Sequence, residues 1–392
     1  MKFQASDNLI DLFVGQLIYA TPAAPVRELL QNAYDACTLQ SVEHQDFKPS
    51  ITTTVSRSGN WFEVDDNGIG MDQDIVEQSF SMVGRPKSEI PSIAALIQKG
   101  GLQAAQIATF GVGVLSCFRI AERVIVSTRM DDKEPLKFVV EDPREEFVPV
   151  REKLRQSRGT SVRVEIKPNA GFTGNDAYNA VFQFARHVEG LKILDSDSSS
   201  MQALNQKYDG EDYPEKLVIK NEDIRYGIIA LNDAWEMPTA QWSNSMRLDN
   251  GGFQVLAHDA SVLPSYCFGY TAEIDFTPQR VQLMVNRENF VQDQKFNSIK
   301  IFLLQQYLSL VENKIKNWTG NISGDSGMAQ QKQALREHLL VLEHNLPGDQ
   351  HTKDLRSLVT DTIGKYIQFP LYGPTNRNLT LEEIRKSGTP IY

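Results

Sequence analysis

The sequence has few cysteines, no excess of basic residues and no long apolar run. Its three cysteines, Cys37, Cys117 and Cys267, lie far apart and show no C-x-x-C spacing. This pattern argues against a zinc site or a disulfide framework and is typical of a reducing compartment. The 50 acidic residues outnumber the 40 basic ones, which gives a formal net charge of -10. This balance argues against broad nucleic-acid binding, because such binding needs dense Lys and Arg.

Membrane-spanning and targeting segments are not evident either. No apolar run approaches the ~18 residues of a membrane span, and the first residues, MKFQASDNLIDLF, lack a basic region followed by a long apolar core. We therefore expect a cytoplasmic protein without a membrane partner. The 392 residues, 41% of them hydrophobic, allow two or three domains with cores of their own.

A polar stripe marks the helix predicted from the stretch RELLQNAYDAC, residues 27–37. Glu28, Asn32 and Asp35 are spaced i, i+4 and i+7 and therefore lie on one side of that helix, close to its apolar face. Most such stripes face water, so a solvated face is the simpler interpretation of this segment alone.

Three glycine-containing turns follow that helix. EVDDNGIGMD, residues 63–72, comes after a predicted hairpin of residues 51–55 and 61–64. A plain hairpin exit turn is the simpler interpretation of these residues. An EF-hand calcium loop is the weaker one, because Glu63 would come first and Asp74, not Glu, would come last. FGVGVLSCF, residues 110–118, places two glycines just before a short helix, where backbone N–H groups suit phosphate. SRGTSVRVEI, residues 157–166, opens an alternating strand with Gly-Thr. Between the first two turns, residues 81–109 have no clear hydrophobic period, which predicts a functional lid.

Each motif is weak alone, but their order resembles that of the GHKL ATPases, which include gyrase, the ninety-kilodalton heat-shock chaperones, histidine kinases and MutL. Residues 110–129 and 262–293 resemble the chaperones more closely, at their phosphate loop and at the start of their middle domain. The resemblance implies an α+β fold that begins with a Bergerat-type two-layer α/β sandwich, a mixed sheet covered by helices on one face. This ATP-binding domain is expected at residues 1–195, with its lid at about 81–109.

The rest of the chain is divided in the same way. A polar, acidic stretch from Asp195 to Asp212 is typical of a linker or exposed loop. Beyond it we expect a smaller α/β transducer-like domain at residues 215–320, with a long helix at 297–318. A helical C-terminal segment and tail are expected at residues 325–392.

The resemblance also implies ATP and Mg²⁺ as ligands and assigns two catalytic residues. Glu28 would be the general base that polarises the attacking water, and Arg287 would reach the γ-phosphate from the second domain. Asn32 would be the metal ligand. Lys295 is a second cationic candidate, and Gln292 stands one position beyond the place where the chaperones carry a glutamine.

The residues implied to contact the nucleotide form an adenine side, a phosphate loop and a lid. Asp66 would accept a hydrogen bond from the adenine amine. Thr160 would hydrogen-bond near Asp66, usually through a water molecule. Asp35 would support the site or the ribose, with a solvated carboxylate as an equal alternative, and Lys87 has an exposed lysine as its alternative. The full set besides Asn32 is Asp35, Asp66, Gly70, Met71, Gly84, Lys87, Phe110, Gly111, Val112, Gly113 and Thr160.

Three functions are consistent with this pattern. The first is a chaperone-like ATPase with slow Mg²⁺-dependent hydrolysis, lid closure and domain docking. It would bind ATP and ADP and a protein client or partner. It would also form a nucleotide-dependent homodimer. The second is a GHKL ATPase of DNA transactions or defence, akin to MutL. The third is a nucleotide-gated dimerisation module with little turnover, because few residues follow the long helix.

Overall fold

The computed structural model describes most of the chain. The described residues are 1–6, 10–11, 21–83, 85, 89–101, 113–204, 206–236, 244–255, 262–278, 280–284, 289–320, 329–371 and 377–387. They divide into two compact units: Met1–Gln206 with Asp249–His258 and Phe276–Val291, and Lys207–Leu248 with Asp259–Asp275 and Gln292–Tyr392. Within these ranges no helix has the length and apolar character needed to span a membrane.

The first unit is built on an eight-stranded mixed sheet of order β5-β4-β3-β6-β2-β1-β7-β8. Neighbouring strands are antiparallel except for β1 and β7, which are parallel. In chain order the strands are β1 (Ile51–Ser56), β2 (Trp61–Asp66), β3 (Ala121–Arg129), β4 (Leu136–Val140), β5 (Val148–Pro149), β6 (Gly159–Ile166), β7 (Leu191–Asp195) and β8 (Ser200–Ala203).

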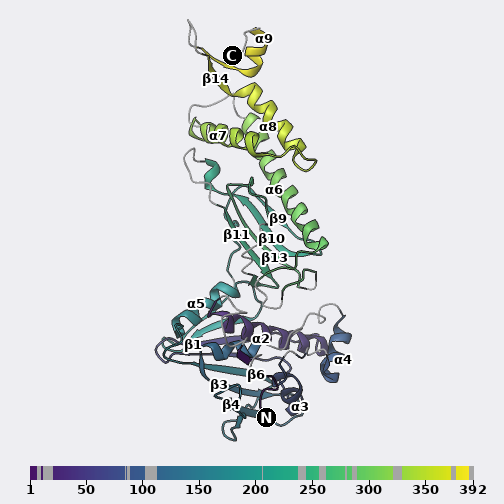
Figure 1. Ribbon diagram of the computed structural model, residues 1–392, viewed down its shortest axis with the longest axis vertical. Coiled ribbons are helices and arrows are strands. Elements are labelled where there is room, and N and C mark those ends of the chain that lie inside the picture. The colour runs from purple at the N-terminus through teal and green to yellow at the C-terminus, as the bar shows by residue number, and fades with distance from the viewer. Residues whose placement is uncertain are drawn as a thin grey trace. The chain divides into compact units, whose positions relative to one another are not determined.

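Helices cover this sheet on the face that forms the core. α2 (Ala24–Glu43) and α5 (Gly174–Phe184) contact each other and both pack on β1 and β2; Figure 1 shows them lying along the strands. The predicted helix over residues 27–37 is thus confirmed, with Pro25 in its first turn. The shorter elements are α3 (Gln73–Ile75), the π-helix η1 (Val76–Phe80), α4 (Pro91–Gly100) and the 3₁₀ helix η4 (Gly113–Arg119).

The predicted hairpin of β1 and β2 is also confirmed, and its register determines where the first turn begins. Alternate residues of a strand point to the same face, so Phe62, Val64 and Asp66 of β2 are all buried. A carboxylate thereby enters the core at the end of a strand. The same register excludes the EF-hand alternative, because a strand and not a helix supplies Glu63 and leads into the turn.

The stretch from Asp195 predicted as a linker or exposed loop begins as an exposed turn at residues 197–199, and it departs from the prediction where it continues as strand β8. Strands β7 and β8 pair antiparallel and turn between Asp195 and Ser200. Asp197 in that turn accepts hydrogen bonds from the Ser56 hydroxyl and the Ser58 N–H, each at 2.8 Å. A polar sequence therefore forms an ordered hairpin, because its carboxylate accepts from the last residue of β1 and from the turn that follows that strand.

The remaining strands form a five-stranded sheet of order β12-β11-β13-β10-β9 and a two-stranded sheet of β14 and β15. The strands are β9 (Lys216–Ile219), β10 (Ile224–Leu231), β11 (Ser245–Asn250), β12 (Phe253–Val255), β13 (Tyr270–Phe276), β14 (Gln368–Leu371) and β15 (Arg377–Thr380). The helices are η5 (Asp233–Glu236), α6 (Gln294–Gly320), α7 (Ala329–Asn345), α8 (Lys353–Tyr366) and α9 (Leu381–Ser387). α6 confirms the predicted long helix, and the chain is α+β, as predicted.

Candidate nucleotide-binding site

The polar stripe of α2 does not face water. Glu28 is 5% exposed and Asp35 is 9% exposed, while Asn32 is half-buried. Burying a carboxylate is costly unless it is paired and hydrogen-bonded, so a helix with two of them is not a solvated amphipathic face. The simpler interpretation of this segment is therefore wrong for Glu28 and Asp35.

A buried cation lies next to Glu28 on the same helix. The Arg27 Nη2 is 3.4 Å from the Glu28 Oε1, and the Arg27 side chain is 1% exposed. The Arg27 guanidinium also lies over the Phe184 ring of α5, 5.6 Å from its centroid. This positive charge offsets part of the cost of burying Glu28.

We expect the Arg27→Leu substitution to destabilise the first unit strongly. Removing one partner of a buried ion pair leaves the other charge uncompensated, which costs about 3–5 kcal/mol. Urea denaturation of wild type, Arg27→Leu, Glu28→Gln and the double variant measures this cost, and the double variant should recover part of the loss. If Arg27→Leu unfolds at the urea concentration of the wild type, the pair has no such role.

Glu28 meets the second glycine of the Gly-x-Gly turn. A methyl group built on Gly113 would lie only 2.6 Å from the Glu28 Oε2. The negative charge of Glu28 also contributes, after burial, to a raised pKa of the Cys117 thiol on η4. The structure thus brings together two motifs that are 85 positions apart in the chain (113 − 28), and glycine at position 113 leaves the carboxylate its place.

Asp66 forms the centre of a second group of predicted residues. Its Oδ1 accepts from the Gly68 N–H at 2.8 Å and from the Thr160 N–H at 3.3 Å. The Thr160 hydroxyl is 2.9 Å from the Thr128 hydroxyl, which accepts from the Met71 N–H at 2.8 Å. The turn after β2 and the start of β6 are therefore tied together around one buried carboxylate.

Burial raises the pKa of Asp66 to about 7. The Gly68 N–H, the positive charge of Arg155 and the Thr160 N–H act in the opposite direction, and the neighbouring Asp65 adds a smaller increase. The charged form is therefore present in quantity at neutral pH and disappears as the pH falls below about 7.

Gly70 is required by the backbone itself. Its φ is +70°, and a methyl group built on it would lie 1.9 Å from the Arg129 carbonyl oxygen at the end of β3. Met71 follows it, half-buried against the core of the first unit. The glycine thus allows the turn to pack on β3, next to the Asp66 group.

Several predicted residues lie outside the part of the chain that the structure describes. These are Gly84 and Lys87 of the lid, Phe110, Gly111 and Val112 of the phosphate loop, and Arg287. Two further candidates are described, both in the second unit. The Lys295 Nζ lies 2.8 Å from the Asp223 Oδ1, and the Gln292 Oε1 accepts from the Lys300 Nζ at 2.7 Å.

Sequence reasoning missed two residues near Asp66, Thr128 and Arg155. Thr128 follows an alternating apolar pattern in β3 and is fully buried, so the only signal was a hydroxyl at a core position. The Arg155 side chain is 11% exposed and forms an ion pair with Asp65. No local pattern distinguishes it from the other basic residues of the loop.

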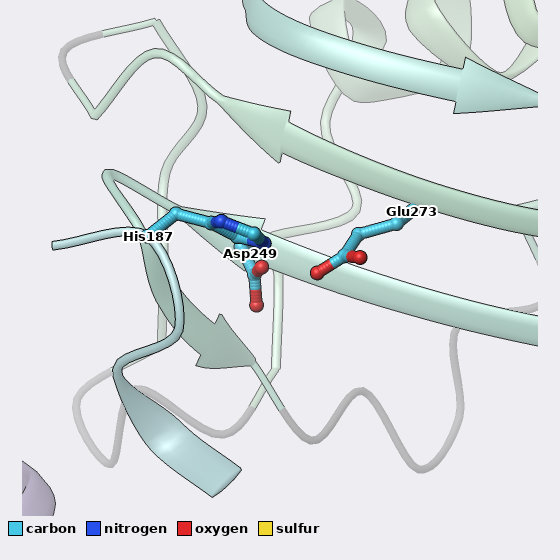
Figure 2. Close-up of side chains that lie close together, drawn as sticks. All are labelled: His187, Asp249 and Glu273. Atoms are coloured by element: carbon cyan, nitrogen blue, oxygen red, sulfur yellow. The ribbon is translucent and has the colours of Figure 1, made fainter. Parts of the chain in front are cut away.

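Figure 2 shows another group of polar side chains, none of them predicted from the sequence. In the first unit, ligand atoms of His187 and Asp249 lie within 4.8 Å of each other. In the second unit, the Glu273 carboxylate takes an ion pair from the Arg247 Nε at 3.0 Å and a hydrogen bond from the Asp209 N–H at 2.6 Å. Because both Glu273 oxygens already meet donors, we assign no metal to these residues.

Comparison with known proteins gives many matches to one family. The chain is a distant relative of the ninety-kilodalton heat-shock family, a family of GHKL ATPases. No protein-family model matches the chain.

Three of these relatives are bacterial proteins named chaperone protein HtpG. That of Helicobacter hepaticus is 23% identical over 246 residues, which are 60% of this chain and 38% of the relative. That of Alcanivorax borkumensis is 31% identical over 207 residues, 50% of this chain and 33% of the relative. That of Azorhizobium caulinodans is 32% identical over 130 residues, 31% of this chain and 20% of the relative. In these matches the chain spans at most 38% of the relative's length.

Proposed function

We propose that the chain binds ATP with Mg²⁺ and hydrolyses it slowly, on a Bergerat-type sandwich at residues 1–195. The observation that carries this proposal is the burial of Glu28 on α2 against Gly113. A structural helix gains nothing from a buried carboxylate aimed at a glycine turn, whereas a hydrolase needs a fixed base beside its phosphate loop. The relationship to the HtpG proteins supports the same reading.

In this proposal α2 supplies the chemistry at the phosphates. Glu28, held on a helix and beside Arg27, accepts the proton of the attacking water. Asn32 is one helical turn further on and only half-buried, and its neutral amide oxygen is a ligand type that Mg²⁺ accepts. When bound, Mg²⁺ offsets the negative charge of the phosphate oxygens. Asp35 is buried two turns from Glu28 and supports the site from the ribose side.

Asp66 recognises the adenine base in this proposal. Its Oδ1 is occupied by two backbone N–H groups, while among the described residues no donor reaches its Oδ2. That oxygen is available to the exocyclic amine of adenine. The neighbouring Gly70 leaves room for the purine, Met71 packs on it, and Thr160 completes the base side.

The remaining contacts are proposed from the resemblance to the heat-shock chaperones. Phe110, Gly111 and Val112, with Gly113, cradle the phosphates through backbone N–H groups. Gly84 and Lys87 belong to the lid at about 81–109, which closes over the nucleotide. Arg287 contacts the γ-phosphate from a transducer-like domain at residues 215–320, so the site is complete only after that domain docks.

The relationship to HtpG also supports a chaperone-like function in general. We extend it to a protein client or partner and to a nucleotide-dependent homodimer. The helical segment at residues 325–392 is proposed to pack on the transducer-like domain.

Phosphate release from Mg²⁺-ATP tests the hydrolytic part of the proposal. We expect slow, saturable release that stops when EDTA removes the metal, because the phosphate charge is then no longer offset. Calorimetric ATP binding is measured on the same preparation. ATP binding without any release would favour the nucleotide-gated module instead, and release stimulated by DNA would favour the MutL-like alternative.

A further inference from the structure

Arg155 joins the loop before β6 to the end of β2. Its Nη1 donates to the Asp65 carboxylate, and its Nη2 donates to the Asp66 carbonyl oxygen at 2.7 Å and to the Arg158 carbonyl oxygen at 3.3 Å. Its Nε donates to the Ser157 carbonyl oxygen at 2.9 Å. One guanidinium therefore holds two segments whose residues are about ninety positions apart.

The glycine of the Gly-Thr pair makes this contact sterically feasible. Gly159 has a φ of +115°, and a methyl group built on it would lie 1.9 Å from the Asp66 carbonyl oxygen and 2.9 Å from the Arg155 Nη2. Any larger residue would separate β6 from the end of β2. The glycine at this motif position is thus explained by the approach of Arg155 and Asp66.

Titratable groups on β2, in the loop before β6 and on α2 surround the Asp66 carboxylate. Asp65 on β2 raises its pKa, whereas Arg155 in the loop lowers it. On the side of α2 stands the Cys37 thiol, whose own pKa is raised to about 12 by burial and by the Asp66 charge. Arg158 in the loop acts on that thiol in the opposite direction. Among the largest influences on the pKa of Asp66 from the described residues, Arg155 is the positive side chain that lowers it.

We propose that Arg155 is a positioning residue for base recognition, which fixes the end of β2 and supplies the positive charge that keeps the Asp66 carboxylate a hydrogen-bond acceptor. This inference rests on the proposed function, in which Asp66 accepts from adenine. The two hydrogen-bonding nitrogens of the guanidinium hold the end of β2 in place, and the positive charge of Arg155 favours the ionised form of Asp66. A lysine at this position would keep the second contribution and lose most of the first.

Calorimetric binding of ADP from pH 5.5 to 9 tests the proposal on wild type, Arg155→Gln and Arg155→Lys. Wild-type affinity should fall as the pH drops through about 7, because protonated Asp66 no longer accepts from the amine. In Arg155→Gln this midpoint should move to higher pH. For a shift of one pH unit the resulting loss of affinity is roughly five-fold at pH 7, close to ten-fold at pH 5.5 and much smaller at pH 9. Comparing variants at each pH cancels the titration of the ADP phosphates.

Arg155→Lys separates charge from geometry. It should bind more weakly than wild type at every pH, with an unmoved midpoint, and it remains informative if Arg155→Gln does not fold. A constant ratio between Arg155→Gln and wild type across the range, or a midpoint that moves equally in Arg155→Lys, would overturn the proposal. If wild type binds no ADP at any pH, the proposed function itself fails and the inference falls with it.

Discussion

Glu28→Gln is expected to slow ATP hydrolysis by about 10²–10⁴-fold, the usual contribution of a general base, while ATP binding changes little. The amide has the shape of the carboxylate but cannot take a proton from water. It also keeps an oxygen toward Arg27 on the same helix, so the local structure is better preserved than in Glu28→Ala. Phosphate release and calorimetric binding on the same samples measure the two effects separately.

Glu43 offers a matched control for this experiment. It is exposed at the C-terminal end of the same helix, so Glu43→Gln makes the same chemical change away from Gly113 and should hydrolyse ATP at the wild-type rate. A Glu28→Gln protein that turns over ATP as fast as Glu43→Gln would show that Glu28 is not the base. It would return the buried carboxylate to a structural role.

Asp66→Asn is expected to weaken adenine nucleotide binding on the order of 100-fold, as about 3 kcal/mol for a hydrogen bond to a charged group implies. The asparagine oxygen can still accept from the Gly68 and Thr160 N–H groups, which now meet Oδ1. Its NH₂ group then takes the place of Oδ2 and confronts the adenine amine donor with another donor.

Base preference provides the control for that variant. Inosine diphosphate presents a 6-oxo acceptor in place of the adenine amine, so wild type should prefer ADP, and Asp66→Asn should lose or reverse this preference. Both ligands have the same phosphates, and the comparison therefore isolates the base side of the site. An unchanged preference for ADP in Asp66→Asn would mean that Asp66 does not contact the base.

Much of the first unit was predictable from local patterns. The helical period of α2, the alternation in β1 and β2 and the position of Pro25 depend on neighbouring residues alone. The stripe on α2 was visible too, but its burial was not. That burial depends on η4, which packs against α2 from far along the chain.

The residues that sequence reasoning missed act through tertiary contacts. Thr128 matters because β3 places its hydroxyl opposite Thr160. Arg155 matters because its loop returns to the end of β2. The ordered hairpin inside the stretch predicted as a linker or exposed loop also depends on tertiary contacts, since Asp197 accepts from the Ser56 hydroxyl and the Ser58 N–H on another part of the chain. The composition of a segment indicates how that segment behaves in water, but it does not indicate which hydrogen-bond partners the folded chain brings next to it.

The proposed function stands most directly on whether the wild-type chain binds ATP, and calorimetric titration with ATP in the presence of Mg²⁺ answers this question. The expected result is saturable binding, with one nucleotide per chain and a weaker response to inosine triphosphate. The contradicting result is the absence of binding heat for ATP and ADP alike, on a preparation that unfolds cooperatively in urea. In that case the buried stripe of α2 would have to serve the fold alone.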